Sequence, residues 1–211
     1  MERTISSTSN AVVKDAVRLH RSRRRRETGR ILVEGPTVFD AALSAGLEPE
    51  IVFVLEADTD TRDLGRQRGW DVVVVPEHVL EHVADADHPR SPVAVFEMPE
   101  PSEVDEGDVV VLVDLADPGN VGTIIRTAAA LGWQAAVTVG CADPWGPKAL
   151  RAGAGAQFLI GVGQVDRTAI GELTHVTVAT VVDGGASDAP AGPGRALLIG
   201  SEAHGLPDHV A

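Results

Sequence analysis

The residue types best suited to chemistry lie in one segment of the second half of the chain. Residues 114–132 read Asp-Leu-Ala-Asp-Pro-Gly-Asn-Val-Gly-Thr-Ile-Ile-Arg-Thr-Ala-Ala-Ala-Leu-Gly. Asn120 is a good N-cap residue, and the apolar positions after it follow helical spacing up to Gly132. Gly122 and Arg126 lie four residues apart and therefore share a face of the predicted helix. Gly122 leaves room for a close approach, and the guanidinium of Arg126 offers a planar set of donors to a phosphate or a developing oxyanion.

The elements around this segment predict an anion-binding site. The continuous apolar run 109–113 is typical of a strand that is buried on both faces of a parallel sheet. A strand, a Gly-rich turn and a helix N-terminus in succession place main-chain N–H groups where an anion binds. The alternative at this stage is that Arg126 is a structural arginine on a helix surface.

The rest of the second half predicts an open α/β sheet. Its ligands are then expected at the carboxyl ends of the strands. The expected strands are 109–113, 135–139, 158–162, 175–182 and 196–199, the expected helices are 120–131, 147–152 and about 167–173, and a loop of small residues covers 186–193.

The first half predicts a second, smaller α/β domain because strand-like and helix-like stretches alternate. Residues 98–107 are polar, contain prolines and lack periodicity, so we interpret them as a linker between a domain at 1–97 and one at 108–211. The expected helices are 8–26, 36–44, 61–68 and 77–83, and the expected strands are 31–33, 51–55, 71–75 and 93–96.

Charge is distributed very unevenly along the chain. The net charge is -13, but residues 1–30 carry nine basic and three acidic side chains, a balance of +6, which leaves -19 for the remainder. Such a cationic patch attracts a phosphate backbone. The alternative is a solvated helix face or a disordered arm. The candidate RNA-binding residues are Lys14, Arg21, Arg23, Arg24, Arg25 and Arg26.

Three segments in order resemble the SpoU branch of the SPOUT RNA methyltransferases. Asn120-x-Gly122-x-x-x-Arg126 after Asp-Pro-Gly resembles its motif 1, and residues 147–156 resemble the following PKAxRxSxGA segment, with Gly153 where serine is usual. Residues 197–206, with Gly-x-Glu-x-x-Gly after a strand, resemble motif 2. Residues 5–35 resemble the family's small RNA-binding substrate domain, so the resemblance covers nearly the whole chain.

The resemblance implies an S-adenosylmethionine-dependent transfer of a methyl group to a ribose 2'-hydroxyl. The family assigns activation of the hydroxyl to Arg126. Because arginine stays protonated, we expect it to hold a phosphate and stabilise the developing oxyanion. Asn120 would hold the motif 1 loop or the ribose, and Glu202 would hydrogen-bond the loops or serve as a purely structural acceptor. The positions that match the cofactor wall are Thr180, Ile199 and Gly200, where the glycine would let the main chain approach the adenosine.

The family's third motif and closing helix do not follow motif 2 in this sequence. In the family that tail makes a trefoil knot, contacts the cofactor and packs at the dimer interface. The knot is therefore expected only where the tail is present, and we expect a chain ending at Ala211 to bind the cofactor weakly.

The remaining features set the expected partners and the alternatives. Ribosomal RNA is expected before transfer RNA, the oligomer is expected to be a homodimer, and the absence of apolar membrane spans together with a single Cys141 favours the cytoplasm. The alternatives are a non-catalytic RNA-binding relative and a small-molecule enzyme on a similar sheet. His78 and His82 match a zinc-protease pattern, H-x-x-E-H, but no third ligand lies nearby, which favours an exposed helix face.

Overall fold

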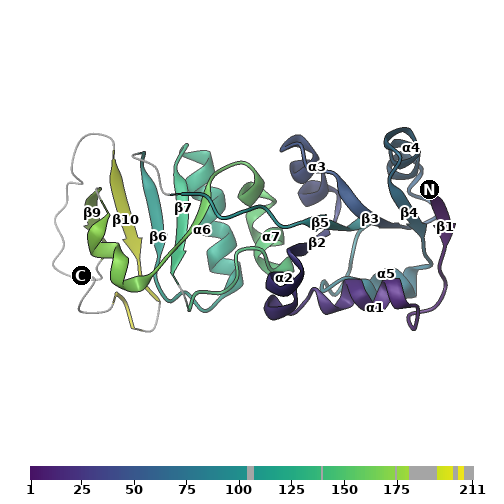
Figure 1. The fold of residues 1–211 in the computed structure, drawn as a ribbon, viewed down its shortest axis with the longest axis horizontal. Coiled ribbons are helices and arrows are strands. Elements are labelled where there is room, and N and C mark those ends of the chain that lie inside the picture. The colour runs from purple at the N-terminus through teal and green to yellow at the C-terminus, as the bar shows by residue number, and fades with distance from the viewer. Residues whose placement is uncertain (104–106, 139, 174, 181–193, 202–203, 207–211) are drawn as a thin grey trace.

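The computed structural model describes residues 1–103, 107–138, 140–173, 175–180, 194–201 and 204–206. Within these ranges the chain forms two five-stranded sheets, one in each half (Figure 1). The two halves lie end to end along the longest axis of the molecule, with helices packed on both sheets (Figure 1). The α/β class that the alternating pattern predicts for both halves is confirmed.

The sheet of the first half is mixed, with the strand order β1-β4-β3-β5-β2. β5 is antiparallel to its neighbours β2 and β3, whereas β1 and β3 are parallel to β4. Alternate side chains enter two different cores, as shown by Phe53 in one core and Val52 and Val54 in the other. The strands are β1 (Glu2–Thr4), β2 (Arg30–Glu34), β3 (Pro49–Val54), β4 (Asp71–Val74) and β5 (Val93–Glu97).

Helices cover both faces of this sheet (Figure 1). α1 (Ala11–Arg18) and α5 (Glu77–Val83) share a core with Phe53, and α3 (Pro36–Ser44) and α4 (Thr59–Arg68) pack on the opposite face. α2 (Ser22–Thr28) lies at the end of the domain that faces the second half. The basic helix is therefore placed beside the other domain.

The prediction of one helix over residues 8–26 is wrong, because the chain breaks between α1 and α2. Nη1 of Arg25 donates to the main-chain oxygen of Leu19 at 2.7 Å and to that of His20 at 3.0 Å. A continuous helix would use these two carbonyls in its own ladder. The arginine satisfies them instead, which stabilises the break.

The sheet of the second half is parallel throughout, with the order β8-β7-β6-β10-β9. The chain leaves β6 toward one edge and later returns on the other side of β6, so the topological switch point lies between β6 and β10. The strands are β6 (Val109–Leu112), β7 (Gln134–Thr138), β8 (Val162–Val165), β9 (Val176–Ala179) and β10 (Arg195–Ile199).

α6 (Pro118–Ala130) packs on one face of this sheet beside α7 (Pro147–Gly153). The predicted N-cap at Asn120 is wrong: Asp117 caps the helix by accepting from the amide of Gly119 at 3.0 Å. Pro118 occupies the first helical position, where a missing N–H costs nothing. Asn120 therefore lies inside the first turn.

Several other predicted bounds differ from the structure. β1 was not predicted, since a three-residue polar strand carries no periodic signal. The predicted strand 158–162 is wrong, because the short 3-10 helix η1 (Ala156–Phe158) precedes β8, which begins at Val162. The helix expected near 167–173 is a second 3-10 helix, η2 (Arg167–Glu172). The predicted loop 186–193 and the end of the predicted strand 175–182 lie outside the described residues.

Candidate functional site

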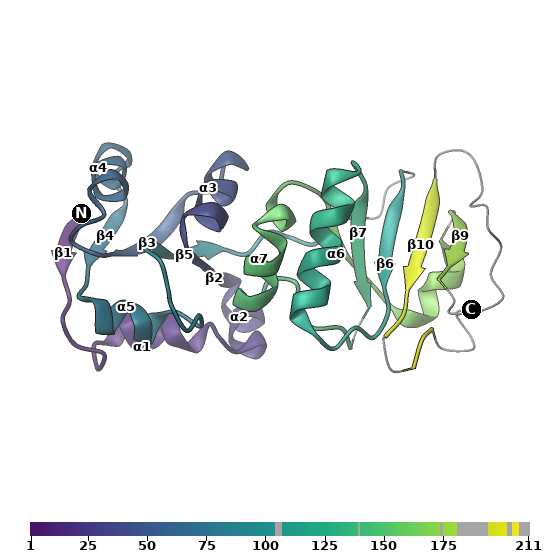
Figure 2. The same cartoon turned by 180° about the vertical axis from the view of Figure 1, so that it is seen from behind.

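The loops that follow β6 and β10 emerge at the same end of the parallel sheet. Leu112 and Ile199 are register partners, and the amide of Val113 donates to the carbonyl of Ile199 at 2.8 Å. Figure 2 shows the chain turning away from both strands at one end of the sheet, where α6 begins. Open α/β sheets bind ligands in the crevice at such a switch point. Asn120 and Gly200 thus lie at the end of the sheet where a ligand is expected.

The first turn of α6 is tied to the start of α7. The ammonium of Lys148 contacts the carboxylate of Asp117 at 2.8 Å, and the Gly119 amide donates to the same oxygen. The Lys148 ammonium and the Gly119 amide hold the pKa of Asp117 below its ordinary value. Asn120 is half-buried in this turn. The two motif-like segments at 117–126 and 147–156 therefore meet at the N-terminus of α6.

Gly122 and Arg126 have different surroundings, although helical spacing puts them near one face of α6. A Cβ at Gly122 would lie 2.2 Å from the main-chain oxygen of Ala149 and 2.8 Å from the amide nitrogen of Gly153. The close approach expected at Gly122 is therefore made by α7, and no ligand has to fill that space. Arg126 is exposed and forms no hydrogen bond or ion pair with any described residue. Its guanidinium is available to an anion.

The three predicted cofactor-wall residues end neighbouring strands. Both the amide and the hydroxyl of Thr180 donate to the carbonyl of Leu198, at 3.1 and 2.9 Å. A ligand would therefore reach Thr180 through its main-chain carbonyl. Ile199 is half-buried against the core under α6. These positions fit a nucleoside that is held mostly by main-chain groups, and their role in binding stays a prediction.

Gly200 is required by its own turn. A Cβ there would lie 2.3 Å from the carbonyl carbon of Gly205 and 2.5 Å from the amide nitrogen of Leu206. Ser201 and Gly205 exchange main-chain hydrogen bonds at 3.1 and 2.8 Å, which closes the turn. The space that the sequence assigned to a close approach by adenosine is filled by this backbone. Glu202, the third predicted catalytic residue, lies outside the described residues.

Asp114, which the sequence analysis did not single out, stands at the end of the central strand β6. Its φ is 57°, in the left-handed region that non-glycine residues seldom adopt. Its carboxylate contacts Nη2 of Arg167 at 2.5 Å, and its amide is 3.3 Å from the hydroxyl of Thr138. Strained backbone of this kind is concentrated at functional sites. A carboxylate directly after a buried strand was the signal that could have found it.

The arginine run on α2 is divided between the surface and the interior. The side chain of Arg23 is 86% exposed and pairs with Glu27 on the next turn. Arg24 is 34% exposed and contacts Asp15 and Glu27. Arg26, Arg21 and Lys14 are exposed and have no carboxylate partner within the described part of the chain. These five side chains remain candidates for contacts with RNA phosphates.

Arg25 does not belong with them, because its side chain is only 3% exposed. Its Nε and Nη2 donate to the carboxylate of Asp143 at 3.1 and 2.6 Å, across the boundary between the two halves. A second contact crosses the same boundary, where Arg151 of α7 binds the buried carboxylate of Glu34 at 2.5 Å and that of Asp85 at 3.1 Å. Arg25 is therefore a structural residue that joins the domains, and its prediction as an RNA ligand is corrected.

Comparison with known proteins places the chain in a family. Residues 108–211 match the SpoU rRNA Methylase family, and residues 10–94 match the MRM3-like substrate binding domain. The 23S rRNA (guanosine(2553)-2'-O)-methyltransferase RlmP of Bacillus subtilis strain 168 is 32% identical over 212 residues, which cover 96% of this chain and 84% of RlmP. The chain belongs to the SpoU rRNA methylase family.

Solved structures of related methyltransferases share the fold of both halves. The AdoMet-bound rRNA methyltransferase from Sinorhizobium meliloti is 28% identical with a TM-score of 0.84, over 99% of this chain and 85% of that one. The SpoU methyltransferase AviRb from Streptomyces viridochromogenes, in complex with AdoMet, is 26% identical with a TM-score of 0.82, over 95% of this chain and 84% of AviRb. The family and fold implied by the three ordered motifs are confirmed.

The zinc-protease pattern at His78 and His82 finds no support in the described residues. Both imidazoles are exposed on α5, and Nε2 of His78 lies 3.2 Å from the carbonyl of Ser6. No cluster of three or more His, Cys, Asp or Glu side chains there is arranged to hold a metal ion. None of the helices in the same ranges is both long and apolar enough to cross a membrane.

Proposed function

We propose that this protein transfers a methyl group from S-adenosylmethionine to a ribose 2'-hydroxyl of ribosomal RNA. The observation that carries the proposal is that motif 1 and motif 2 follow adjacent strands at the same end of the sheet, while the exposed guanidinium of Arg126, in the second half of α6, pairs with none of the described residues. Membership of the SpoU family and the rRNA 2'-O-methyltransferase activity named for RlmP support it.

The cofactor supplies an electrophilic methyl group on a sulfonium. As the bond from the ribose oxygen to the methyl carbon forms, the carbon–sulfur bond breaks and the hydroxyl loses its proton. Arg126 does not take this proton, since a guanidinium is always charged. It instead orients a neighbouring phosphate, whose oxygen accepts the proton, and stabilises the negative charge that develops on the ribose oxygen. Asn120 holds the loop that aligns the two reacting groups.

The exposed cations of the N-terminal domain support an RNA substrate. Lys14 and Arg21 stand on or beside α1 and α2 without carboxylate partners in the described chain, and Arg23 keeps most of its surface open. The match of residues 10–94 to a substrate binding domain agrees with this placement. Ribosomal RNA is favoured over transfer RNA because RlmP and the Sinorhizobium meliloti enzyme are both named as rRNA methyltransferases.

The proposal is tested by methyl transfer from tritiated S-adenosylmethionine to rRNA that lacks the modification, using the full-length protein. We expect label on rRNA and protection of one ribose from alkaline cleavage. Arg126→Ala should slow transfer by about 100- to 1,000-fold, as for removal of an oxyanion donor, with a much smaller loss of RNA affinity from the missing phosphate contact. Binding of rRNA without any methyl transfer would identify a non-catalytic RNA-binding relative and overturn the enzyme proposal.

Three further expectations from the sequence accompany this proposal. The protein is proposed to be a homodimer, to act in the cytoplasm, and to consist of domains at 1–97 and 108–211 joined by a linker at 98–107. Sedimentation of the full-length protein tests the first of these, since a single monomeric species at micromolar concentration would contradict it.

A further inference from the structure

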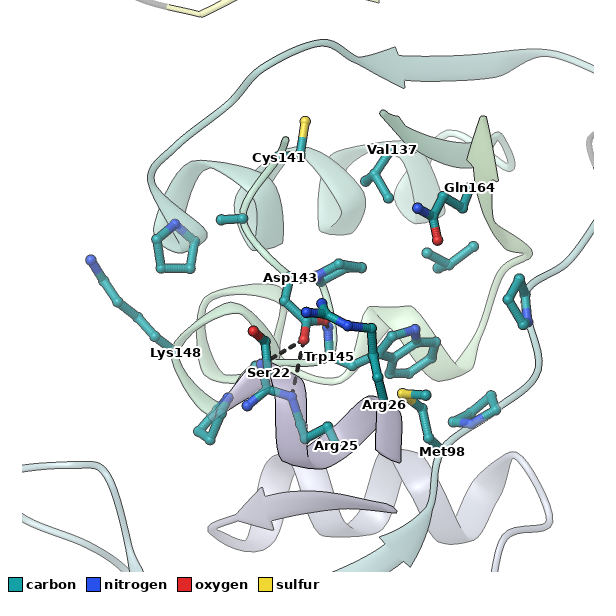
Figure 3. A pocket seen from close by; sticks show the side chains of 18 of the residues that line it. Ser22, Arg25, Arg26, Met98, Val137, Cys141, Asp143, Trp145, Lys148 and Gln164 are labelled. Atoms are coloured by element: carbon teal, nitrogen blue, oxygen red, sulfur yellow. Dashed lines mark hydrogen bonds and ion pairs between the residues drawn. The ribbon is translucent and has the colours of Figure 1, made fainter. Parts of the chain in front are cut away.

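A cavity of about 830 Å³ lies between the two domains and extends to Pro118 at the start of α6. α2 and residues 98–101 form one wall, and the opposite wall comes from the ends of β7 and β8 and from the segment 140–148. Figure 3 shows the side chain of Arg26 extending from α2 toward the middle of this space, with Val137 and Gln164 facing it from the other domain. Cavities of this size at domain boundaries commonly bind ligands.

The charges that line the cavity favour an anion. Its two lining carboxylates already have partners, because Asp143 binds Arg25 and Asp85 binds Arg151. Arg26 has no such partner among the residues that the structure describes, and Lys148 at the rim is 58% exposed. The cavity therefore presents one uncompensated guanidinium at its centre.

The walls around Arg26 are amphipathic. Met98 is half-buried in the wall, and the buried side chains of Val137, Val162 and Trp145 contribute the rest of its apolar lining. The ring of Phe158 packs on Trp145 at 5.5 Å between centroids. Gln164 is exposed into the space and carries both a donor and an acceptor. Unpaired nucleotides are bound by this combination: a cation for the phosphate, apolar surface for the base plane and an amide for the base edge.

We propose that this interdomain cavity holds one unpaired nucleotide of the RNA substrate, with its phosphate on Arg26 and its base against the apolar lining beside Gln164. The proposal rests on the RNA-directed function above and adds a point of contact with the RNA at the boundary between the domains. Ser22, Arg25 and Arg26 of α2 line the cavity, so an RNA strand that crosses the exposed cations of that helix passes next to it.

The first test measures binding of a fluorescein-labelled single-stranded RNA 12-mer of mixed sequence by fluorescence anisotropy. Arg26→Ala should weaken binding about tenfold and lower the slope of log affinity against log salt by about one, as for loss of one phosphate contact. Gln164→Ala should weaken binding about threefold with the slope unchanged, since no ion is released. Arg66→Ala on α4, at the far end of the molecule, is the matched arginine control and should bind like the parent.

The second test uses the same RNA as a duplex and with single 4-thiouridine substitutions. We expect the duplex to bind equally well to the parent and to Arg26→Ala, because a paired base does not enter the cavity. Photo-crosslinks from the single strand should fall on peptides that contain Trp145 or Gln164. Crosslinks confined to other peptides, or an Arg26→Ala variant that binds single-stranded RNA like the parent, would overturn the proposal.

These outcomes are separable from those of the proposed function. If the cavity proposal fails alone, Arg26→Ala binds the 12-mer and methylates rRNA as the parent does. If the methyl-transfer proposal fails alone, no label reaches rRNA, while the Arg26-dependent binding and the crosslinks persist.

Discussion

The two helices that carry the candidate arginines, α2 and α6, differ in what surrounds each guanidinium. On α2 four successive arginines have three kinds of environment: Arg25 is buried against Asp143, Arg23 and Arg24 pair with carboxylates, and Arg26 enters a cavity. On α6 a single arginine, Arg126, stands exposed among small residues and pairs with no described carboxylate.

Helix geometry explains the contrast. Consecutive residues are separated by about 100° around the axis, so a run of four cannot share one face. A helix packed against another domain must then bury at least one member of the run. A high local charge therefore overstates the number of cations that reach a ligand, whereas an isolated arginine on an otherwise apolar helix has few structural partners and is easier to assign.

The sharpest way to break this contrast is to remove the buried arginine. Arg25→Ala leaves Asp143 without its partner and frees the carbonyls of Leu19 and His20, so we expect the free energy of unfolding to fall by about 3–5 kcal/mol. Arg23 lies two residues away on α2 and is 86% exposed, so Arg23→Ala should change the free energy of unfolding by less than about 0.5 kcal/mol. Urea unfolding followed by far-UV circular dichroism measures both. Equal losses in the two variants would show that the environments do not differ in energy.

A second variant separates the donor geometry of the Arg126 guanidinium from its positive charge. Arg126→Lys keeps the positive charge but cannot bind a phosphate through two parallel donors, so we expect methyl transfer to slow by about tenfold or more. The thermal midpoint should stay within about 1 °C of the parent, because the side chain has no partner in the described chain to lose. Single-turnover methylation of rRNA measures the effect, and a lysine variant as fast as the parent contradicts the role given to the guanidinium.

The smallest expected effect is on stability and concerns the ion pair between Arg195 and Asp108 in the second half. The guanidinium and the amide of Arg195 hold the pKa of Asp108 at about 2, below the ordinary value of 3.8. A carboxylate with a depressed pKa in the folded state stabilises the fold above its ordinary pKa, and this contribution is lost as the pH falls toward about 2. The urea midpoint of the parent should therefore exceed that of Asp108→Asn near neutral pH, and the difference should shrink between about pH 4 and pH 2. A difference that is independent of pH would exclude this linkage.

Local signals in the sequence predicted most elements of the fold. The bounds of α3 and α5 agree with the prediction residue for residue, since Pro36 and Pro76 mark their starts. The break between α1 and α2 was not predictable, because it depends on Arg25, whose other partner, Asp143, lies 118 residues further along the chain. The short strand β1 is specified by pairing with β4 rather than by its own residues.

The sequence predicted where the candidate site lies better than it predicted why particular residues occur there. Motif order correctly placed the first turn of α6, with Asn120, and the turn at Ile199 and Gly200 at the same end of the sheet. Gly122 and Gly200, however, are glycines because α7 and the Gly205 turn fill the space beside them, which only the packed structure reveals. Asp114 carries no sequence signal apart from its place after a strand, and its strain appears only in the backbone angle.

The ion pairs of Arg25 and Arg151 have a consequence for how a target nucleotide is chosen. Both span the domain boundary, so they fasten the N-terminal domain to the second domain at two places. An RNA bound to α2 would then reach the crevice where the methyl group is transferred at a fixed distance from its contacts on α2. Selection among riboses would then depend on the folded shape of the RNA between those two points.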